Sequence, residues 1–367
     1  MTPLRIVIAG GGTGGHLYPG IAVAREVLRR QPDATITFAG TARGIESRVV
    51  PKEGFQLDVL RSTGLKGTSP VALLRGLSLL PLSGVDAWRI LSRRSPHLVI
   101  GVGGYSSGPV VAAAIAQRIP TLLLEQNAQP GFTNRVLARY VGGAAVTFAS
   151  TVGYFGGRGF VAGNPVRPEF FADVDVEPAA GPPRVLIFGG SQGSHAINVA
   201  MVEAAPRLAA LHGGMAVTHQ TGERDLEFVR SAYERARFTA RVEPYLFTMD
   251  REIKSADLVV SRAGATTIAE LAAAGRPSVL VPLPTAADDH QRKNAEVFRD
   301  AGAADLIEQK DLTGAVLADR IASLVADQAR LQAMGAAARA LAKPDAAKVI
   351  VDRALELASS RRADRNG

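Results

Sequence analysis

The sequence predicts an α/β protein built from two Rossmann-like halves. The clearest sign is an internal repeat, because RIVIAGGGTGGH at residues 5–16 resembles RVLIFGGSQGSH at residues 184–195. Each copy is an apolar strand, a glycine-rich turn and the start of a helix, which is how a nucleotide-binding βα unit opens. Alternating strand and helix patterns follow each copy, as parallel sheets with crossover helices require. We therefore expect two domains that share one plan.

Length and composition agree with this plan. The chain has 367 residues, more than one hydrophobic core usually serves. It contains 38 glycines, whereas aromatic residues make up only 5%, a composition that suits tight strand-to-helix turns. Lys and Arg outnumber Asp and Glu by 42 to 34, which favours anionic partners such as phosphates or lipid headgroups. With no cysteine, disulfides, thiolate metal ligands and thiol nucleophiles are excluded.

The expected elements follow from the hydrophobic pattern. Strands are predicted at residues 35–39, 98–102, 121–124 and 144–148 of the first half, and at 216–219, 258–261 and 278–281 of the second. A helix-rich tail covers residues 312–360, and Pro344 is expected to break it. Residues 172–183 are rich in Pro, Ala and acid and predict a linker. The first residues run directly into a strand, so we expect no signal peptide, and no stretch predicts a membrane span.

Four glycine-rich loops, at residues 10–15, 103–108, 189–193 and 262–267, follow predicted strands. Glycine lets backbone N–H groups converge, and a helix N-terminus behind them carries partial positive charge, so each loop suits a phosphate. The alternative is that glycine only permits tight turns and close packing. Ligands of parallel sheets lie beyond the carboxyl ends of the strands. Two facing domains would thus hold two phosphate-bearing ligands in one cleft.

The first loop also satisfies G-x-G-x-x-G, so a dinucleotide oxidoreductase has to be considered. That class expects an acid about 20 residues further on, at the end of the second strand. Here this strand ends in AGT at residues 39–41. The missing acid weakens the dinucleotide hypothesis.

Seven motifs then occur in order along nearly the whole chain. They are GGTGGHLYPG at 11–20, GGYSSGP at 103–109, EQN at 125–127, NPVR at 164–167, GGSQG at 189–193, GATTIAE at 264–270 and DDHQ at 288–291. In this order and spacing they resemble the MurG family of UDP-N-acetylglucosamine:undecaprenyl-pyrophosphoryl-muramyl-pentapeptide transferases.

The resemblance implies a GT-B fold, in which two Rossmann-like domains turn their parallel sheets toward a central cleft. It implies an inverting transfer of N-acetylglucosamine from UDP-N-acetylglucosamine to the C4 hydroxyl of undecaprenyl-pyrophosphoryl-N-acetylmuramyl-pentapeptide. This is the step from lipid I to lipid II in peptidoglycan synthesis, at the cytoplasmic face of the cell membrane. No metal, other cofactor or nucleic acid is expected.

The resemblance also divides the chain. Residues 1–164 would bind the acceptor and the membrane, residues 165–344 would bind the donor, and the helix at 345–367 would pack back on the first domain. On matching positions the implied donor contacts are Thr13, Gly14, Gly15, Asn127, Arg167, Ser191, Leu246, Ala265, Thr266, Thr267, Ile268, Ala269, Glu270 and Gln291. Uracil would lie near Ser191 and the backbone of Leu246. The acceptor pyrophosphate is assigned to Gly104, Tyr105 and Ser106.

Glycosyl transfer needs a base for the attacking hydroxyl, and two residues are candidates. His16 ends the first glycine-rich loop, although it could instead only bind the pyrophosphate or a loop carbonyl. Glu125 follows an apolar strand, although it could instead pair with a basic group. Departing pyrophosphate can be stabilised by backbone N–H groups, so a cation is not obligatory.

Several other residues have more than one interpretation. Glu270 would hold the ribose hydroxyls, but Thr267 and Glu270 also have capping-box spacing. Arg167 is either a cation near uracil or phosphate, or a plain charge at the domain boundary. Gln291 either begins a solvated helix or reads sugar hydroxyls with both ends of its amide. Ser194 and His195 stand where relatives more often carry Ala-Arg, which puts in doubt any role assigned to them.

Metal binding is not predicted. Asp173 and Asp175 form a D-x-D pair, but they lie in the predicted linker, away from the glycine-rich loops, and are interpreted as solvated acids. The six histidines show no paired ligand spacing.

Residues 70–94 mix leucines and Trp88 with Arg75, Arg89, Arg93 and Arg94. This pattern suits an interfacial patch on an anionic phospholipid surface. A buried pair of amphipathic helices is the alternative.

Three other functions compete with the transferase. The first is a UDP-N-acetylglucosamine epimerase or a transferase that makes another glycolipid. The second is a non-catalytic nucleotide-sugar sensor at the membrane, and the third is the dinucleotide oxidoreductase. UDP release that depends on the lipid-linked muramyl acceptor separates the transferase from the first. Donor binding without turnover would indicate the second, and titration with NADH tests the third.

Overall fold

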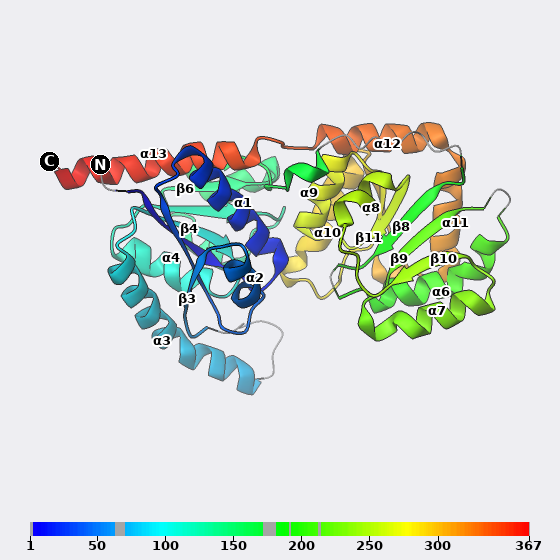
Figure 1. Ribbon diagram of the computed structural model, residues 1–367, viewed down its shortest axis with the longest axis horizontal. Helices are drawn as coiled ribbons and strands as arrows, with labels where there is room; N and C mark the ends of the chain where they lie inside the picture. Colours follow the sequence, from blue (N-terminus) through cyan, green and yellow to red (C-terminus); the bar gives the residue numbers. More distant parts are fainter. Residues whose placement is uncertain (1–2, 63–69, 172–180, 191, 212–213, 367) are drawn as a thin grey trace. The chain divides into compact units, whose positions relative to one another are not determined.

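The computed structural model describes residues 3–62, 70–171, 181–190, 192–211 and 214–366, with the backbone alone at 70–80 and 360–366. The chain forms two compact units (Figure 1). The first comprises Met1–Val166 and Lys343–Gly367, and the second Arg167–Ala342. No helix in the described residues is long and apolar enough to cross a membrane.

The first unit is a seven-stranded sheet in the order β3-β2-β1-β4-β5-β6-β7, with every neighbouring pair parallel. Its strands are β1 Arg5–Gly10, β2 Thr35–Gly40, β3 Gln56–Val59, β4 Leu98–Gly103, β5 Thr121–Glu125, β6 Gly143–Val146 and β7 Gly159–Val161. Its helices are α1 Gly14–Arg30, α2 Glu46–Lys52, α3 Pro70–Arg94, α4 Ser107–Ala116, α5 Phe132–Leu137 and α13 Ala346–Asn366, with a 3₁₀ segment at Ala149–Arg158.

The second unit is a six-stranded parallel sheet in the order β10-β9-β8-β11-β12-β13. Its strands are β8 Arg184–Phe188, β9 Ala216–Gln220, β10 Ala240–Glu243, β11 Leu258–Ser261, β12 Ser278–Leu280 and β13 Ala304–Leu306. Its helices are α6 His195–Ala209, α7 Leu226–Arg235, α8 Met249–Ser255, α9 Ala265–Ala274, α10 His290–Asp300, α11 Gly314–Ala326 and α12 Gln328–Ala340. Short 3₁₀ turns lie at Pro168–Phe170, Glu223–Asp225, Ala287–Asp289 and Gln309–Asp311.

In both sheets the order of successive strands reverses at the first strand of the unit. In the first unit β1 pairs with β2 on one side and β4 on the other, and in the second β8 pairs with β9 and β11. The point at which the strand order reverses lies between β1 and β4 in the first unit and between β8 and β11 in the second. Open parallel sheets bind their ligands at such a point, beyond the carboxyl ends of the strands.

Strand residues in the first unit alternate between two hydrophobic cores. Ile6 and Ile8 pack with α1 and α13, whereas Val7 and Ala9 face α3 and α4 on the other side (Figure 1). A sheet buried on both faces explains why its central strands are almost continuously apolar. In the second unit α6, α7 and α11 cover one face and α8, α9 and α10 the other (Figure 1).

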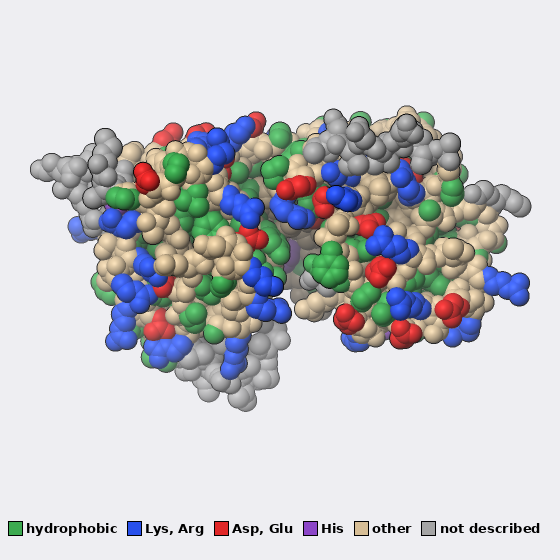
Figure 2. Space-filling view, viewed as in Figure 1, with side chains coloured by type: hydrophobic (Ala, Val, Ile, Leu, Met, Phe, Trp, Pro, Cys, Tyr) green, Lys and Arg blue, Asp and Glu red, His purple; other side chains and the backbone are tan. Residues whose placement is uncertain are grey.

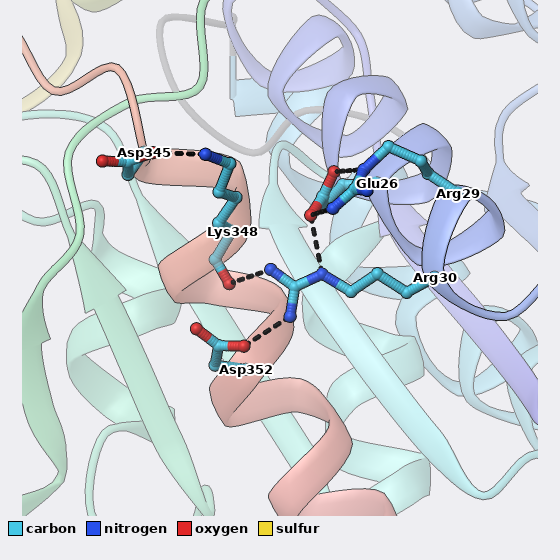
Figure 3. Close-up of polar contacts among 6 residues, drawn as sticks. All are labelled: Glu26, Arg29, Arg30, Asp345, Lys348 and Asp352. Carbon is cyan, nitrogen blue, oxygen red and sulfur yellow. Dashed lines mark hydrogen bonds and ion pairs between the residues drawn. The ribbon is translucent and has the colours of Figure 1, made fainter.

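Helix α13 is fixed to α1 by charge as well as by apolar packing (Figure 3). Arg30 donates to Glu26 at 2.6 Å and to the carbonyl of Lys348 at 3.2 Å, and it pairs with Asp352. Hydrogen bonds from Arg29 and Arg30 lower the pKa of Glu26 to about 2, against the effect of desolvation. The last helix of the chain thus belongs to the first unit.

Candidate active site

The two glycine-rich loops of the first unit pack directly against each other. The N–H of Gly11 donates to the carbonyl of Gly103 at 3.3 Å. A Cβ on Gly10 would lie 2.3 Å from the Gly103 oxygen, and one on Gly104 would lie 2.2 Å from the Gly11 oxygen. Two backbones can approach this closely only where side chains are missing. Glycine is therefore required here for packing.

Gly104→Ala is expected to lower the free energy of unfolding of the first unit by about 2 kcal/mol more than Gly54→Ala. Both glycines have a φ near +80°, but a Cβ on Gly54 would meet nothing within 4 Å. Both variants carry the same backbone strain, so the difference between them measures the steric overlap of the new Cβ with Gly11. Thermal unfolding of the two variants measures the difference, and equal destabilisation would show that the contact with Gly11 relaxes freely.

A buried carboxylate organises the first loop and was not identified from the sequence. Glu46 is 1% exposed and accepts hydrogen bonds from Gly12 N at 2.7 Å, Thr41 N at 2.9 Å and Thr41 Oγ1 at 2.8 Å. Desolvation raises its pKa, but these hydrogen bonds outweigh desolvation and hold the pKa below the usual value. The amide of Gly12 is thus already bound to an internal anion. The expectation that this loop offers its amides to a phosphate is wrong at Gly12.

His16 lies in the first turn of α1, behind the N-cap residue Thr13. Its Nδ1 is 3.2 Å from Oε1 of Gln126. A Cβ on Gly103 would lie 2.7 Å from the same Nδ1, so this glycine makes room for the imidazole ring. The ring is half-buried between the loops that follow β1, β4 and β5.

Glu125 closes the loop that follows β5. It is 3% exposed, and its oxygens accept from Asn127 N at 3.0 Å, Asn127 Nδ2 at 3.3 Å, Gly131 N at 3.0 Å and Asn134 Nδ2 at 2.9 Å. Its partners are amides, so the expected alternative of pairing with a basic group is wrong for the described residues. Four donors on one carboxylate give Glu125 the geometry of a loop-closing residue.

The three residues assigned to the acceptor pyrophosphate differ in access. Tyr105 is 57% exposed, whereas Ser106 is 1% exposed and stands at the N-cap of α4. The carbonyl of Tyr105 accepts from Ser62 Oγ at 3.0 Å. At this loop the tyrosine ring is the side chain that reaches solvent.

In the second unit, the loop after β11 ends at the N-terminus of α9. Gly264 is the N-cap, no side chain caps the helix, and no acid lies in its first turn. The capping-box interpretation of Thr267 and Glu270 is therefore wrong, because the helix begins at Ala265, before Thr267. Backbone N–H groups in the first turn of a helix, together with the helix dipole, suit an anion.

Glu270 lies further along α9 and forms no hydrogen bond or ion pair with any residue that the structure describes. Burial raises its pKa to about 7, while the charge of Arg167 lowers it and that of Asp250 raises it. The guanidinium of Arg167 stacks over the ring of Phe170, 5.1 Å from the centroid. Because its charge acts on Glu270, Arg167 belongs to the surroundings of this acid.

Gln291 and Leu246 are only partly available. Oε1 of Gln291 accepts from the N–H of Leu283 at 3.0 Å, so the expectation that both ends of the amide read sugar hydroxyls is wrong. Its amino group remains for a ligand. The side chain of Leu246 is 3% exposed, which leaves the backbone for a contact.

The sequence analysis also missed Arg262, directly before the α9 turn. Its guanidinium donates to the carbonyls of Val281 and Pro282, each at 3.1 Å, and to Gln309 Oε1 at 2.7 Å. No acid among the described residues pairs with it, and burial lowers its pKa to about 10. A half-buried cation thus lies next to the first turn of α9.

The third glycine-rich loop is braced by β9. Gln220 Nε2 donates to the carbonyl of Gly190 at 2.7 Å, and a Cβ on Gly193 would overlap the carbonyl of Thr221. Ser191, an implied uracil contact, lies outside the described residues. Ser194 is the buried N-cap of α6, and Nδ1 of His195 contacts Asp225 at 2.9 Å.

No cluster of acids and histidines suited to a metal ion occurs in the described part of the chain. Asp173 and Asp175, which the sequence analysis interpreted as solvated acids, lie outside that part.

Residues 70–94 form the single helix α3, so the alternative of a helix pair is wrong. In its described half Ala87, Ile90 and Leu91 are buried, whereas Leu82, Val85 and Trp88 are 41%, 45% and 49% exposed. Figure 2 shows basic and hydrophobic side chains together on the surface of the first unit, in the region of α3 and α4.

The arginines of this helix differ in their surroundings. Arg93 and Arg94 hold the buried Asp58 at 2.6 Å and 2.8 Å, whereas Arg89 is exposed. Side-chain contacts of Arg75 lie outside the described residues.

Comparison with known proteins agrees with this architecture. Residues 6–146 match the N-terminal domain of glycosyltransferase family 28, and residues 184–350 match its C-terminal domain. Two parallel-sheet units with these loops define a glycosyltransferase of the GT-B fold.

Relatives and solved structures narrow the class. The chain is 48% identical over 360 residues to the UDP-N-acetylglucosamine–N-acetylmuramyl-(pentapeptide) pyrophosphoryl-undecaprenol N-acetylglucosamine transferase of Anaeromyxobacter dehalogenans, covering 98% of this chain and 94% of the relative. It is 44% identical to the Geobacter sulfurreducens protein of the same name, covering 95% and 97%. The crystal structure of Acinetobacter baumannii MurG matches with a TM-score of 0.80 and 31% identity, over 96% of this chain and all of that one. The chain belongs to the MurG family of these transferases.

Proposed function

We propose that the protein transfers N-acetylglucosamine from UDP-N-acetylglucosamine to the C4 hydroxyl of undecaprenyl-pyrophosphoryl-N-acetylmuramyl-pentapeptide. Within the molecule, the turn at the start of α9 carries this proposal. The N–H groups of its first turn suit a diphosphate, and Glu270 on the same helix is a half-buried carboxylate with no hydrogen-bond or ion-pair partner among the described residues. A ligand with a diphosphate and a ribose diol complements both, and UDP is such a ligand.

The second unit stabilises the leaving group. As negative charge grows on the departing UDP, the first-turn amides of α9, namely Ala265, Thr266 and Thr267, and the helix dipole bind it more strongly. Ile268 and Ala269 continue this turn, and the Leu246 backbone, Ser191 and Arg167 are the proposed uracil side of the site. The amino group of Gln291 faces the donor sugar.

The first unit activates the acceptor. His16 takes the proton from the attacking hydroxyl. The other candidate base, Glu125, is less suited because its carboxylate already accepts hydrogen bonds from four N–H groups of its own loop. Gly104, Tyr105 and Ser106 are the proposed contacts of the acceptor pyrophosphate. Thr13, Gly14, Gly15 and Asn127 are proposed donor contacts on this unit.

The decisive assay measures UDP release from UDP-N-acetylglucosamine with and without the lipid-linked acceptor. Release that requires the acceptor, together with a disaccharide product, is expected. Release without it would favour an epimerase or hydrolase, and binding without turnover a sensor. Fold alone does not separate these classes, since the UDP-GlcNAc 2-epimerase of Neisseria meningitidis shares the architecture at a TM-score of 0.66 but only 12% identity.

We further propose that the protein works at the cytoplasmic face of the membrane and binds an anionic phospholipid surface through α3. Leu82, Val85 and Trp88 lie at helical spacing on its exposed side, next to Arg89. An apolar strip beside an exposed cation is the pattern of an interfacial helix.

Trp88→Ser together with Arg89→Glu is expected to reduce sedimentation with phosphatidylglycerol vesicles about tenfold, since both the apolar contact and the attraction are lost. Arg93 and Arg94 should be kept, because they hold Asp58. Arg235→Glu, an exposed arginine on α7, is the matched control for charge. Equal sedimentation of both variants and the unmodified protein would contradict the proposal.

A further inference from the structure

We propose that Gln126 is a positioning residue that keeps the imidazole proton of His16 on Nδ1 and so presents Nε2 as the basic nitrogen. The assignment of the proton stands on geometry alone. Its effect on catalysis rests on the proposed function of His16 as the base.

The orientation of the Gln126 amide follows from its surroundings. Gln126 is 3% exposed, and its Nε2 lies 3.1 Å from the carbonyl oxygen of Val102 at the end of β4. A backbone carbonyl only accepts hydrogen bonds, so the amino end of the glutamine must face it. The other end of the amide, Oε1, then faces Nδ1 of His16 at 3.2 Å.

The protonation of His16 follows from that orientation. Oε1 of Gln126 only accepts, so Nδ1 has to donate. A neutral imidazole carries a single N–H, which leaves Nε2 with a free lone pair. Among the described residues no hydrogen bond is formed to Nε2.

A glutamine suits this position better than an acid. A carboxylate on Nδ1 would stabilise the imidazolium, which must later release the acceptor's proton. A neutral amide selects the tautomer without adding charge. It also occupies both the Val102 carbonyl and Nδ1, so the ring has one arrangement.

The test uses the full-length protein labelled with 15N-histidine, and the His16 signal is identified by its loss in His16→Gln. Gln126→Met keeps the volume but removes both hydrogen bonds. Gln129→Met makes the same change in the same loop, where Gln129 contacts Tyr154 and not His16. Gln126→Glu keeps an acceptor for Nδ1 and, when protonated, a donor for the Val102 carbonyl.

The 15N shifts of the unmodified protein are expected to show protonated Nδ1 and unprotonated Nε2, and Gln126→Glu should keep Nδ1 protonated, whereas Gln126→Met should shift toward the other tautomer. In Gln126→Met we expect kcat to fall by about 10²- to 10⁴-fold, because the wrong tautomer removes the general base, while the Kd for UDP should stay within about twofold. Gln129→Met should match the unmodified protein.

Three results would overturn the inference: protonated Nε2 in the unmodified protein, an unchanged tautomer in Gln126→Met, or equal kcat in the two methionine variants. If kcat falls equally in Gln126→Met and Gln126→Glu while both keep the tautomer, the role is structural. If the unmodified protein transfers no sugar, the proposed function fails, but the 15N result still decides the position of the proton.

Discussion

His16→Ala is expected to lower kcat by about 10²- to 10⁴-fold, the usual contribution of a general base. The attacking hydroxyl is a weak nucleophile until its proton is removed, and the structure gives Nε2 of His16 no other partner within the described residues. The Kd for UDP should stay within about twofold. Initial rates at saturating donor and acceptor measure the first quantity, and titration calorimetry with UDP the second.

His195→Ala is the matched control. This histidine also stands at the start of a helix after a glycine-rich loop, but it pairs with Asp225. The His195→Ala substitution should lower kcat by less than about threefold. If His16→Ala retains more than about a fifth of the activity, the histidine only shapes the loop, and the base has to be sought elsewhere.

Glu270→Gln should weaken UDP binding by about 30-fold, or about 2 kcal/mol, because hydrogen bonds to a charged group in a half-buried site contribute about 1.5–3 kcal/mol. The carboxylate can accept from both ribose hydroxyls, whereas the amide can accept at only one end. With 2′,3′-dideoxy-UDP the variant and the unmodified protein should bind equally. Glu234→Gln, an exposed acid on α7, is the control.

The same acid predicts a pH dependence. Its pKa is raised to about 7, so a rising fraction becomes protonated as pH falls through 7, and the protonated form loses an acceptor. Binding of uridine, which has no phosphate to titrate, should therefore be weaker at pH 6 than at pH 8, and Glu270→Gln should abolish the difference. Persistence of the pH effect in the variant would place the titrating group elsewhere.

The two sheets were predictable because their first strands, β1 and β8, are apolar runs that lead directly into glycine-rich turns. The sequence analysis did not identify β3, β7, β10 and β13, which are three or four residues long and partly exposed. Strands this short are stabilised by the neighbour they pair with, so their own pattern is weak.

At the site, motifs located the loops but not the contacts between them. His16 and Gln126 lie 110 positions apart, and only the adjacency of β1, β4 and β5 brings them together. The capping-box spacing of Thr267 and Glu270 was misleading because the backbone turns helical three residues after Arg262, before Thr267. Local spacing does not reveal where a helix begins when the preceding strand fixes the turn.

The carboxylate of Glu46 is an internal anion that binds the first glycine-rich turn. Gly11, Gly40 and Gly44 all leave room for it, since a Cβ on any of them would come within 2.6 Å of its side chain. A turn with the G-x-G-x-x-G pattern can thus be ordered before any substrate binds. The entropic cost of ordering this turn is then not paid during substrate binding. When another chain carries a glycine-rich fingerprint, the structure should therefore be searched for an internal acid that binds the amides of the loop before a nucleotide is assigned to that loop.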